Sequence, residues 1–104
     1  MAQSNDDVIK IVRYFLNEIQ KTRKVELAFL YGSYAKGSSN EWSDIDIAIV
    51  SPDFSDDLLK ERLALMKLAI PIDDRIEAKP FNKKSFDPND PLVYEITKNG
   101  IQLI

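Results

Sequence analysis

Residues 32–50 read GSYAKGSSNEWSDIDIAIV, and this stretch decides the fold because it joins two predicted β-strands through a turn of small residues. The apolar run 25–31, VELAFLY, stops at Gly32 and Ser33, and a second apolar run occupies residues 45–50. Short apolar runs bounded by turn residues are typical of strands. Glycine lets backbone N–H groups approach a phosphate closely, and a helix that begins at Ser33 directs its positive end at the same anion. We therefore expect a phosphate-binding turn between the two strands.

Two aspartates, Asp44 and Asp46, stand one residue apart where the second predicted strand begins. Side chains alternate between the faces of a strand, so both carboxylates fall on one face and Ile45, Ile47 and Ile49 fall on the other. Two residues of strand cover roughly 6.6 Å, a span that short side chains can close around one hard cation or a close pair. Without a cation, two like charges about 4 Å apart at an effective dielectric near 20 cost on the order of 4 kcal/mol. The pattern favours a Mg²⁺ site.

Three further segments have helical patterns. Residues 5–24 carry apolar side chains at helical spacing, with acidic residues near the start and basic residues near the end that complement the helix dipole. Residues 92–98 predict a short helix that closes at Gly100. Residues 56–70 predict a helix that is capped by Ser55 and ends before a proline. Its apolar side chains form one stripe: Leu59, Leu63, Met66 and Ile70.

The strand pattern returns in the second half of the chain. Residues 75–81, RIEAKPF, alternate between polar and apolar side chains and predict a third strand. The final residues, 101–104, are apolar and are expected to dock as a strand or as an ordered tail. These elements predict an α/β (α+β) fold with a small mixed central sheet flanked by helices, over a single domain of residues 1–104.

Composition narrows the classes of function. The 104 residues contain no cysteine, which excludes disulfides and thiolate metal sites, and no histidine, which leaves carboxylate, lysine, tyrosine or metal-bound water as a general base. The formal net charge of −3, with scattered basic residues, makes direct binding of nucleic acid an unfavoured function. The sequence has no signal-peptide pattern and no apolar run near 18 residues, so we expect a cytoplasmic protein without a membrane partner.

The central stretch resembles the signature of the polymerase β nucleotidyltransferase superfamily. The length, the leading helix and the segment 75–81 look most like the minimal nucleotidyltransferases of prokaryotes, one-domain proteins often paired with a HEPN partner as toxin–antitoxin modules. The resemblance covers nearly the whole chain, but its diagnostic part is residues 32–50. The matching positions are Gly32, Ser33, Ala35, Gly37, Ser43, Asp44 and Asp46.

The resemblance also implies a third carboxylate on a following strand, which completes the metal site. Glu77 fits best, because it can lie beside Asp44 and Asp46 if the third strand pairs with the second. Asp73 and Asp74 are rivals, although they precede the strand and have the pattern of a solvated turn. Many relatives carry aspartate where Glu77 stands, so the longer side chain changes the metal geometry in detail but not its charge.

Four other residues near these motifs have more than one interpretation. Lys36 is expected to be a solvated surface charge, whereas Arg75 and Lys79 fit phosphate neutralisation and a solvated surface equally well. Trp42, directly before Ser43, is expected to brace the loop by packing rather than to stack on a base.

The resemblance implies an enzyme, a Mg²⁺-dependent nucleotidyltransferase that acts as an antitoxin. It implies ATP as donor and, as acceptor, a hydroxyl group, typically a tyrosine of the HEPN toxin, which becomes AMP-modified. The implied nucleotide-binding residues are Gly32, Ser33 and Ser43. The implied catalytic residues, which also hold two Mg²⁺ ions, are Asp44, Asp46 and Glu77.

Two alternatives remain open. The first is a binding module without catalysis that neutralises a HEPN partner by covering it. The second is a transferase that modifies a small molecule, although such relatives generally carry an additional helical domain.

Overall fold

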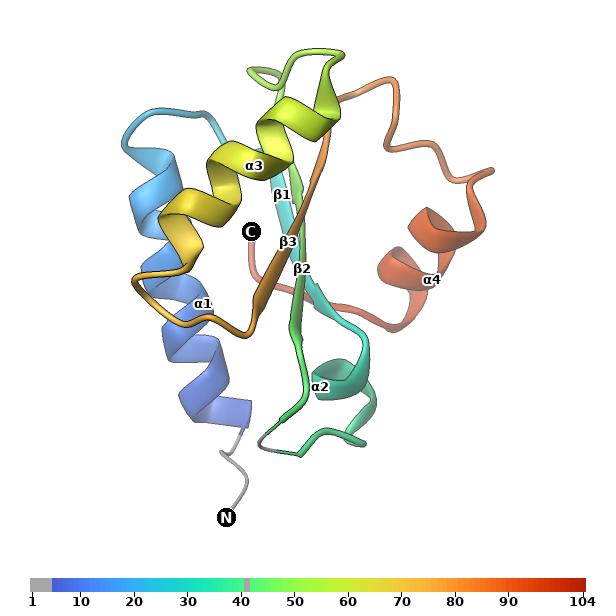
Figure 1. Ribbon diagram of the computed structural model, residues 1–104. Helices are drawn as coiled ribbons and strands as arrows, with labels where there is room; N and C mark the ends of the chain where they lie inside the picture. Colours follow the sequence, from blue (N-terminus) through green and yellow to red (C-terminus); the bar gives the residue numbers. More distant parts are fainter. Residues whose placement is uncertain (1–4, 41) are drawn as a thin grey trace.

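The computed structural model describes residues 5–40 and 42–104 of the chain (Figure 1). The elements follow in the order α1 (Asn5–Gln20), β1 (Leu27–Tyr31), α2 (Ser33–Lys36), β2 (Ile45–Val50), α3 (Leu58–Ala69), β3 (Ile76–Phe81), α4 (Pro91–Asn99) and β4 (Ile101–Gln102). The helix predicted over residues 92–98 is α4, which is longer by one residue at each end.

The strands of the described residues form one mixed sheet in the order β3-β2-β1-β4. β2 runs antiparallel to β1 and parallel to β3, and β4 adds to the free side of β1 in antiparallel orientation. The predicted fold class, a small mixed sheet flanked by helices, is therefore confirmed. The apolar tail forms a short strand, because Ile101 pairs with Leu30 and Gln102 with Phe29.

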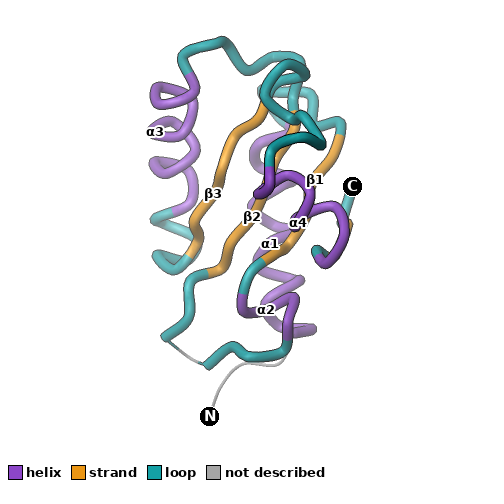
Figure 2. The backbone as a smooth tube through the Cα atoms, turned by 90° about the vertical axis from the view of Figure 1, so that its right-hand side faces the viewer, coloured by secondary structure: helices purple, strands orange, loops and turns teal. Residues whose placement is uncertain are grey.

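Helices cover the two faces of the sheet unequally, as Figures 1 and 2 show. α1 and α3 lie on one face, α4 lies on the other, and the short α2 sits at the end of the sheet where β1 ends and β2 begins. The alternation of β2 explains this arrangement. Ile45, Ile47 and Ile49 are completely buried in the core beneath α1 and α3, whereas Ala48 and Val50 pack in the smaller core with α4.

α1 is shorter than its sequence pattern predicts. The acidic residues Asp6 and Asp7 lie in its first turn as expected, but the helix ends at Gln20 and its last turn contains no basic residue. The N–H groups of Thr22 and Arg23 both donate to the carbonyl of Ile19, which closes the helix with a turn. The basic residues that were expected to complement the dipole therefore lie beyond the helix, and Arg23 is used elsewhere.

α3 corrects two further expectations. Its cap is Asp57, whose carboxylate accepts from the N–H of Lys60, whereas the hydroxyl of Ser55 accepts from the N–H of Asp57 one turn earlier. The helix also turns its apolar stripe outward instead of into the core. The large side chains that it leaves exposed include all four stripe residues, Leu59, Leu63, Met66 and Ile70.

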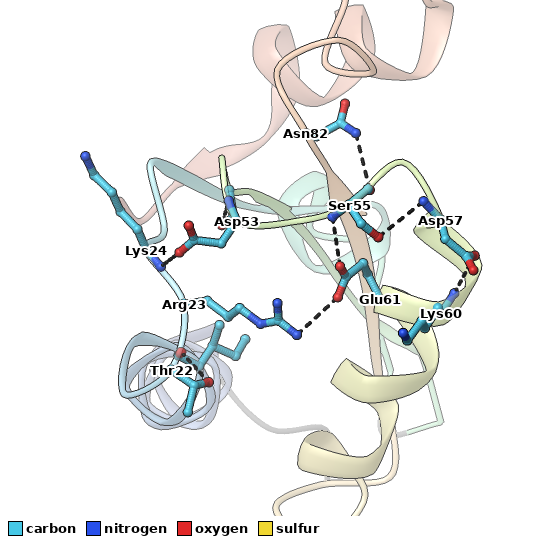
Figure 3. Close-up of polar contacts among 11 residues, drawn as sticks. Thr22, Arg23, Lys24, Asp53, Ser55, Asp57, Lys60, Glu61 and Asn82 are labelled. Carbon is cyan, nitrogen blue, oxygen red and sulfur yellow. Dashed lines mark hydrogen bonds and ion pairs between the residues drawn. The ribbon is translucent and has the colours of Figure 1, made fainter.

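Glu61 lies on the buried face of α3 and contacts Ser55 and Arg23, as Figure 3 shows. Glu61 is 6% exposed; its carboxylate accepts from the N–H of Ser55 at 2.8 Å and pairs with the Arg23 guanidinium at 3.1 Å. Leu65 and Ala69 follow at helical spacing and are buried against the same core. A carboxylate this buried needs its partners, so the helix rotates to keep the ion pair and the stripe faces outward.

The described helices include none that combines the length and the apolar character needed to span a lipid bilayer.

Candidate functional site

The sheet register brings the predicted carboxylates to one face. Asp46 is the direct neighbour of Glu77 on the parallel strand β3 and of Tyr31 on the antiparallel strand β1. The neighbours of Asp46 along β2, Ile45 and Ile47, point into the core on the opposite face. The pairing of the second and third strands, on which the choice of Glu77 depended, is thus confirmed.

These carboxylates line a polar pocket of about 380 Å³. Two cationic side chains, Arg62 and Lys79, border it together with the carboxylates. The pocket therefore contains both charges that a metal–nucleotide complex needs, anionic ligands for a cation and cations for phosphate oxygens. Its lining residues are Tyr31, Asp44, Asp46, Arg62, Glu77, Ala78 and Lys79.

Gly32 sits directly against the Asp46 carboxylate. Its backbone has φ 72° and ψ −145°, a conformation that is accessible essentially only to glycine, and a methyl group at its Cα would overlap Asp46 Oδ2. The helix α2 then begins at Ser33 as predicted and closes at Gly37, which is left-handed with φ 75°. The predicted phosphate-binding turn and the predicted carboxylates therefore meet at a single point.

Mutual repulsion marks the electrostatics of the pocket. Burial raises the pKa of Asp46 above its ordinary value, and the negative charges of Asp44 and Glu77 raise it further. Burial, followed by the charge of Asp46, raises the pKa of the Tyr31 phenol to about 12. Tyr31 is consequently neutral at physiological pH and can donate a hydrogen bond, but it cannot act there as a base.

As the side chains lie, no group of three ligating residues within 5–40 and 42–104 is gathered closely enough to hold a metal ion. One cause is visible at Glu77, whose carboxylate is engaged by the guanidinium of Arg62 at 3.3 Å. The side chains of this ion pair are about half exposed, 50% for Arg62 and 45% for Glu77. The donor set still fits Mg²⁺, because it is all oxygen, anionic and strained by like charge until a cation enters.

The rival carboxylates have other surroundings. Asp73 accepts two hydrogen bonds from the Arg75 side chain, at 2.7 and 3.0 Å, and one from its N–H, and these bonds lower the pKa of Asp73. Arg75 also donates to the hydroxyl of Tyr34, so it ties the start of β3 to α2. Neither Asp73 nor Arg75 lines the pocket, and Asp74 is exposed outside it. Lys79 does line it, which favours the phosphate-neutralising interpretation for Lys79 over Arg75.

The loop between α2 and β2 is held by its own polar groups. Ser43 Oγ accepts from the N–H of Asn40 at 3.0 Å, and Asn40 Oδ1 accepts from the N–H of Trp42 at 2.8 Å. The Trp42 side chain is 82% exposed, so the expectation that it packs against the loop was wrong. The buried Tyr34, whose hydroxyl donates to the Asn40 carbonyl, braces the loop instead. Lys36 is exposed, as expected, and pairs with Glu95 at 3.5 Å.

Arg62 and Tyr31 are the two pocket residues with polar side chains that the sequence did not single out. Tyr31 ends the predicted strand 25–31, and its place beside Asp46 follows only from the antiparallel register. Arg62 belongs to α3 on the opposite face and reaches Glu77 at β3, the last strand of the sheet on that side. No local sequence signal predicts a contact that depends on which strand lies at the edge.

Comparisons with known proteins agree with this geometry. The family model described as Polymerase beta, Nucleotidyltransferase matches residues 14–104. The protein adenylyltransferase MntA of Shewanella oneidensis is 35% identical over 77 residues, 74% of this chain, which spans about half (51%) of MntA.

Two solved structures of toxin–antitoxin complexes show the same fold. One, solved with AMP-PNP, is 28% identical with a TM-score of 0.62, covering 98% of this chain and 73% of that one. The other, MntA-HpeT with two aspartates two positions apart replaced by glutamate, is 26% identical with a TM-score of 0.60 and the same coverage, 98% and 73%. Because the family model matches residues 14–104, most of the chain, this chain belongs to the polymerase beta nucleotidyltransferase family.

Proposed function

We propose that this chain is the nucleotidyltransferase component of a toxin–antitoxin pair and transfers AMP from ATP to a hydroxyl of its toxin. One observation carries the proposal: the glycine of the predicted phosphate-binding turn touches Asp46, which the register sets beside Glu77. The name of the MntA relative, a protein adenylyltransferase, supports the reaction. The AMP-PNP complex of a related toxin–antitoxin pair supports ATP as the donor and a toxin as the partner.

Each predicted site residue has a role in this proposal. The backbone at Gly32 and Ser33 holds the triphosphate of ATP, and Ser43 keeps the neighbouring loop in place through Asn40. Lys79 faces the phosphates from the pocket wall, and the neutral Tyr31 donates a hydrogen bond there. The proposed ligands for two Mg²⁺ ions are Asp44, Asp46 and Glu77.

Binding of Mg²⁺ supplies two effects: it lowers the pKa of the attacking hydroxyl and neutralises the charge on the leaving pyrophosphate. The residues of the chain do the rest by orienting the triphosphate for in-line attack at the α-phosphorus, which is where proximity contributes most. In this proposal Glu77 would exchange its contact with Arg62 for Mg²⁺, and the Arg62 guanidinium, which borders the same pocket, would then be available to a phosphate oxygen. Glu77 also accepts the proton of the attacking hydroxyl in this scheme.

For the acceptor we propose a tyrosine of a HEPN-type toxin, which the resemblance in sequence implies. The pocket is open and borders the surface, so a side chain from another protein can enter it. Transfer of AMP adds a bulky anion to the toxin tyrosine, which accounts for silencing. A protein acceptor also agrees with the relative's name, since that name specifies a protein as the substrate class.

A second candidate, a binding module that neutralises its partner without catalysis, is favoured by one observation. The carboxylates of the described residues are not gathered into a metal site, and Glu77 is already paired with Arg62. If that pair persists when Mg²⁺ is added, Glu77 stays engaged and the site stays inactive.

The deciding experiment incubates the purified chain with the toxin encoded beside it, ATP and MgCl₂, and measures the intact mass of the toxin. We expect a gain of one AMP, which is lost in the variant Asp44→Ala with Asp46→Ala and kept in Asp74→Ala, a matched control outside the pocket. Transfer that survives the double substitution would refute the site. Neutralisation of the toxin with no mass gain in the unaltered chain would establish the binding module instead.

A further inference from the structure

The outward face of α3 carries an apolar seam, defined here as Leu59, Leu63, Met66 and Ile70. Their exposed fractions are 69%, 49%, 41% and 57%. The intervals along the helix are 4, 3 and 4 residues, the spacing of the two seam positions in a coiled coil. A helix face with this spacing is suited to packing against another helix, because side chains every three and four residues fit into the spaces between the side chains of the partner helix.

Every charged residue that flanks this seam on α3 is basic. Lys60 and Lys67 follow Leu59 and Met66 on one side, and Arg62 precedes Leu63 on the other. Glu61, the acidic residue of the helix, is turned into the core toward Arg23. The chain as a whole has a net charge of −3, so this basic border is a local property of the seam and not of the composition.

Two hollows border the seam. One, of about 440 Å³, lies along the seam; Lys60 and Lys67 line it together with one acidic residue, Asp57. The other, of about 380 Å³, lies between α3 and β3; Arg62 and Lys79 line it together with one acidic residue, Asp90. Leu59 belongs to both, so the N-terminal half of the seam stands between two depressions. Concavity of this kind is what separates a docking surface from scattered exposed apolar residues.

We propose that the α3 seam is the docking surface for an amphipathic helix of another protein, whose own apolar seam is flanked by aspartate or glutamate. The charges select this occupant over a second copy of the chain. In an α3–α3 pair, antiparallel packing sets Lys60 and Lys67 against each other and parallel packing sets Arg62 near Lys67, and like charges at these flanking positions disfavour pairing. A carboxylate-flanked helix pairs with Lys60 and Lys67, and on the other side it adds a carboxylate beside Arg62, which already pairs with Glu77.

The seam lies next to the carboxylate pocket, so docking there can bring a partner protein to the pocket. Arg62 borders both the seam and the carboxylate pocket, so a helix seated on α3 lies beside the point where an acceptor side chain enters. The inference itself does not rest on nucleotidyl transfer, because the seam, its two lysines and the hollow along it share no residue with the carboxylate pocket. Its failure and the failure of the proposed reaction are therefore separate results.

The test uses two fluorescently labelled synthetic helical peptides that share leucine at the seam positions. One carries glutamate at the flanking positions, and the other carries lysine. Fluorescence anisotropy with the full chain, without ATP or MgCl₂, is expected to show binding of the glutamate peptide at least about tenfold tighter than the lysine peptide. The variant Lys60→Glu with Lys67→Glu is expected to reverse that preference.

A matched pair of variants locates the surface. Met66 and Leu68 are two residues apart on α3 and are both 41% exposed, but only Met66 belongs to the seam. Met66→Ser is expected to weaken binding of the glutamate peptide about tenfold or more, and Leu68→Ser to leave it unchanged, with circular dichroism verifying that both variants are folded. Equal loss in both variants, equal affinity for the two peptides, or absence of binding overturns the proposal. A dimer in sedimentation velocity that Met66→Ser dissolves also overturns it, because the occupant is then a second copy.

Discussion

Replacement of Asp46 by asparagine should make the metal-free protein more stable at neutral pH. The register puts Asp46 beside Glu77 on adjacent strands, which lie about 4.8 Å apart. Two carboxylates about 6 Å apart at an effective dielectric near 20 repel each other by about 3 kcal/mol. The Arg62–Glu77 ion pair and the half-exposed position of Glu77 reduce this repulsion, and we expect about 1 kcal/mol to remain. Removal of that repulsion should raise the melting temperature by about 4 °C.

The pH dependence separates this cause from a change in packing. The pKa of Asp46 is raised in the folded state, so ionising it costs stability. That cost is absent below the ordinary value of 3.8, grows as pH rises from 3.8 through the raised folded value, and is constant above it. The advantage of Asp46→Asn should therefore be present at pH 7 and vanish near pH 3, as measured by thermal and urea denaturation across this range.

Asp73→Asn is the matched control, because the same chemical change should have the opposite sign. Hydrogen bonds from Arg75 lower the pKa of Asp73, so its ionised form stabilises the fold above 3.8, and that stabilisation is lost as pH falls through the lowered folded value. At pH 7 we expect Asp73→Asn to cost about 1–2 kcal/mol.

Addition of MgCl₂ completes the test. Binding to the folded state should raise the melting temperature of the unaltered chain, and Asp46→Asn should blunt that rise. The reasoning is refuted if Asp46→Asn lowers stability at pH 7 without metal, if its effect is the same at pH 3 and pH 7, or if the variant responds to MgCl₂ like the unaltered chain.

Three other predictions test the structure. Gly32→Ala should lower the free energy of unfolding, measured by urea denaturation, by about 2 kcal/mol or more and should abolish ATP binding, because Gly32 has a glycine-only conformation and a methyl group there overlaps Asp46. Gly37→Ala, which has open space around it, should cost only the left-handed strain of about 1 kcal/mol and should still bind ATP. Equal costs in the two variants would contradict the overlap. Glu61→Ala should destabilise the fold by about 2–4 kcal/mol, because it removes a buried ion pair and leaves the Ser55 N–H without its acceptor. A loss of stability below about 0.5 kcal/mol would disprove the part of Glu61 in orienting α3. In a spectrophotometric titration, Tyr31→Phe should remove the tyrosine that ionises near pH 12, and an unchanged curve would argue against its buried, anionic surroundings.

The strands and the main carboxylates could be predicted because their signals are local. The alternation of polar and apolar residues around Asp44 and Asp46 determines that both carboxylates lie on one face of the strand, independently of the rest of the chain. Ile45 and Ile47 are buried on the opposite face, as expected. The choice of Glu77 needed one further condition, pairing of the second and third strands. The parallel register meets that condition at the residue opposite Asp46.

The orientation of α3 could not be predicted from periodicity, because the helix has two apolar faces. Leu65 and Ala69 lie on one face and the seam lies on the other, and the apolar stripe of larger residues is the more conspicuous pattern. The buried face is selected by Glu61 through Arg23, an ion pair between residues 38 positions apart in sequence. Propensity and spacing do not contain such a contact. The prediction that Trp42 packs against its loop was wrong for a similar reason, because the buried Tyr34 already fills the position under the loop.

Pro80 gives the outer strand of the sheet a protection against misassembly. The carbonyls of Arg75 and Phe81 both accept hydrogen bonds from β2 or the residue that follows it, so the odd-numbered residues of β3 turn their backbone groups inward. Pro80 belongs to the alternate set that faces outward, where its missing N–H removes a donor that an incoming strand would need. Extension of the sheet by a foreign strand, the first step toward amyloid-like stacking, is thereby disfavoured along this edge. Association along this edge is therefore left to side chains rather than to backbone hydrogen bonds.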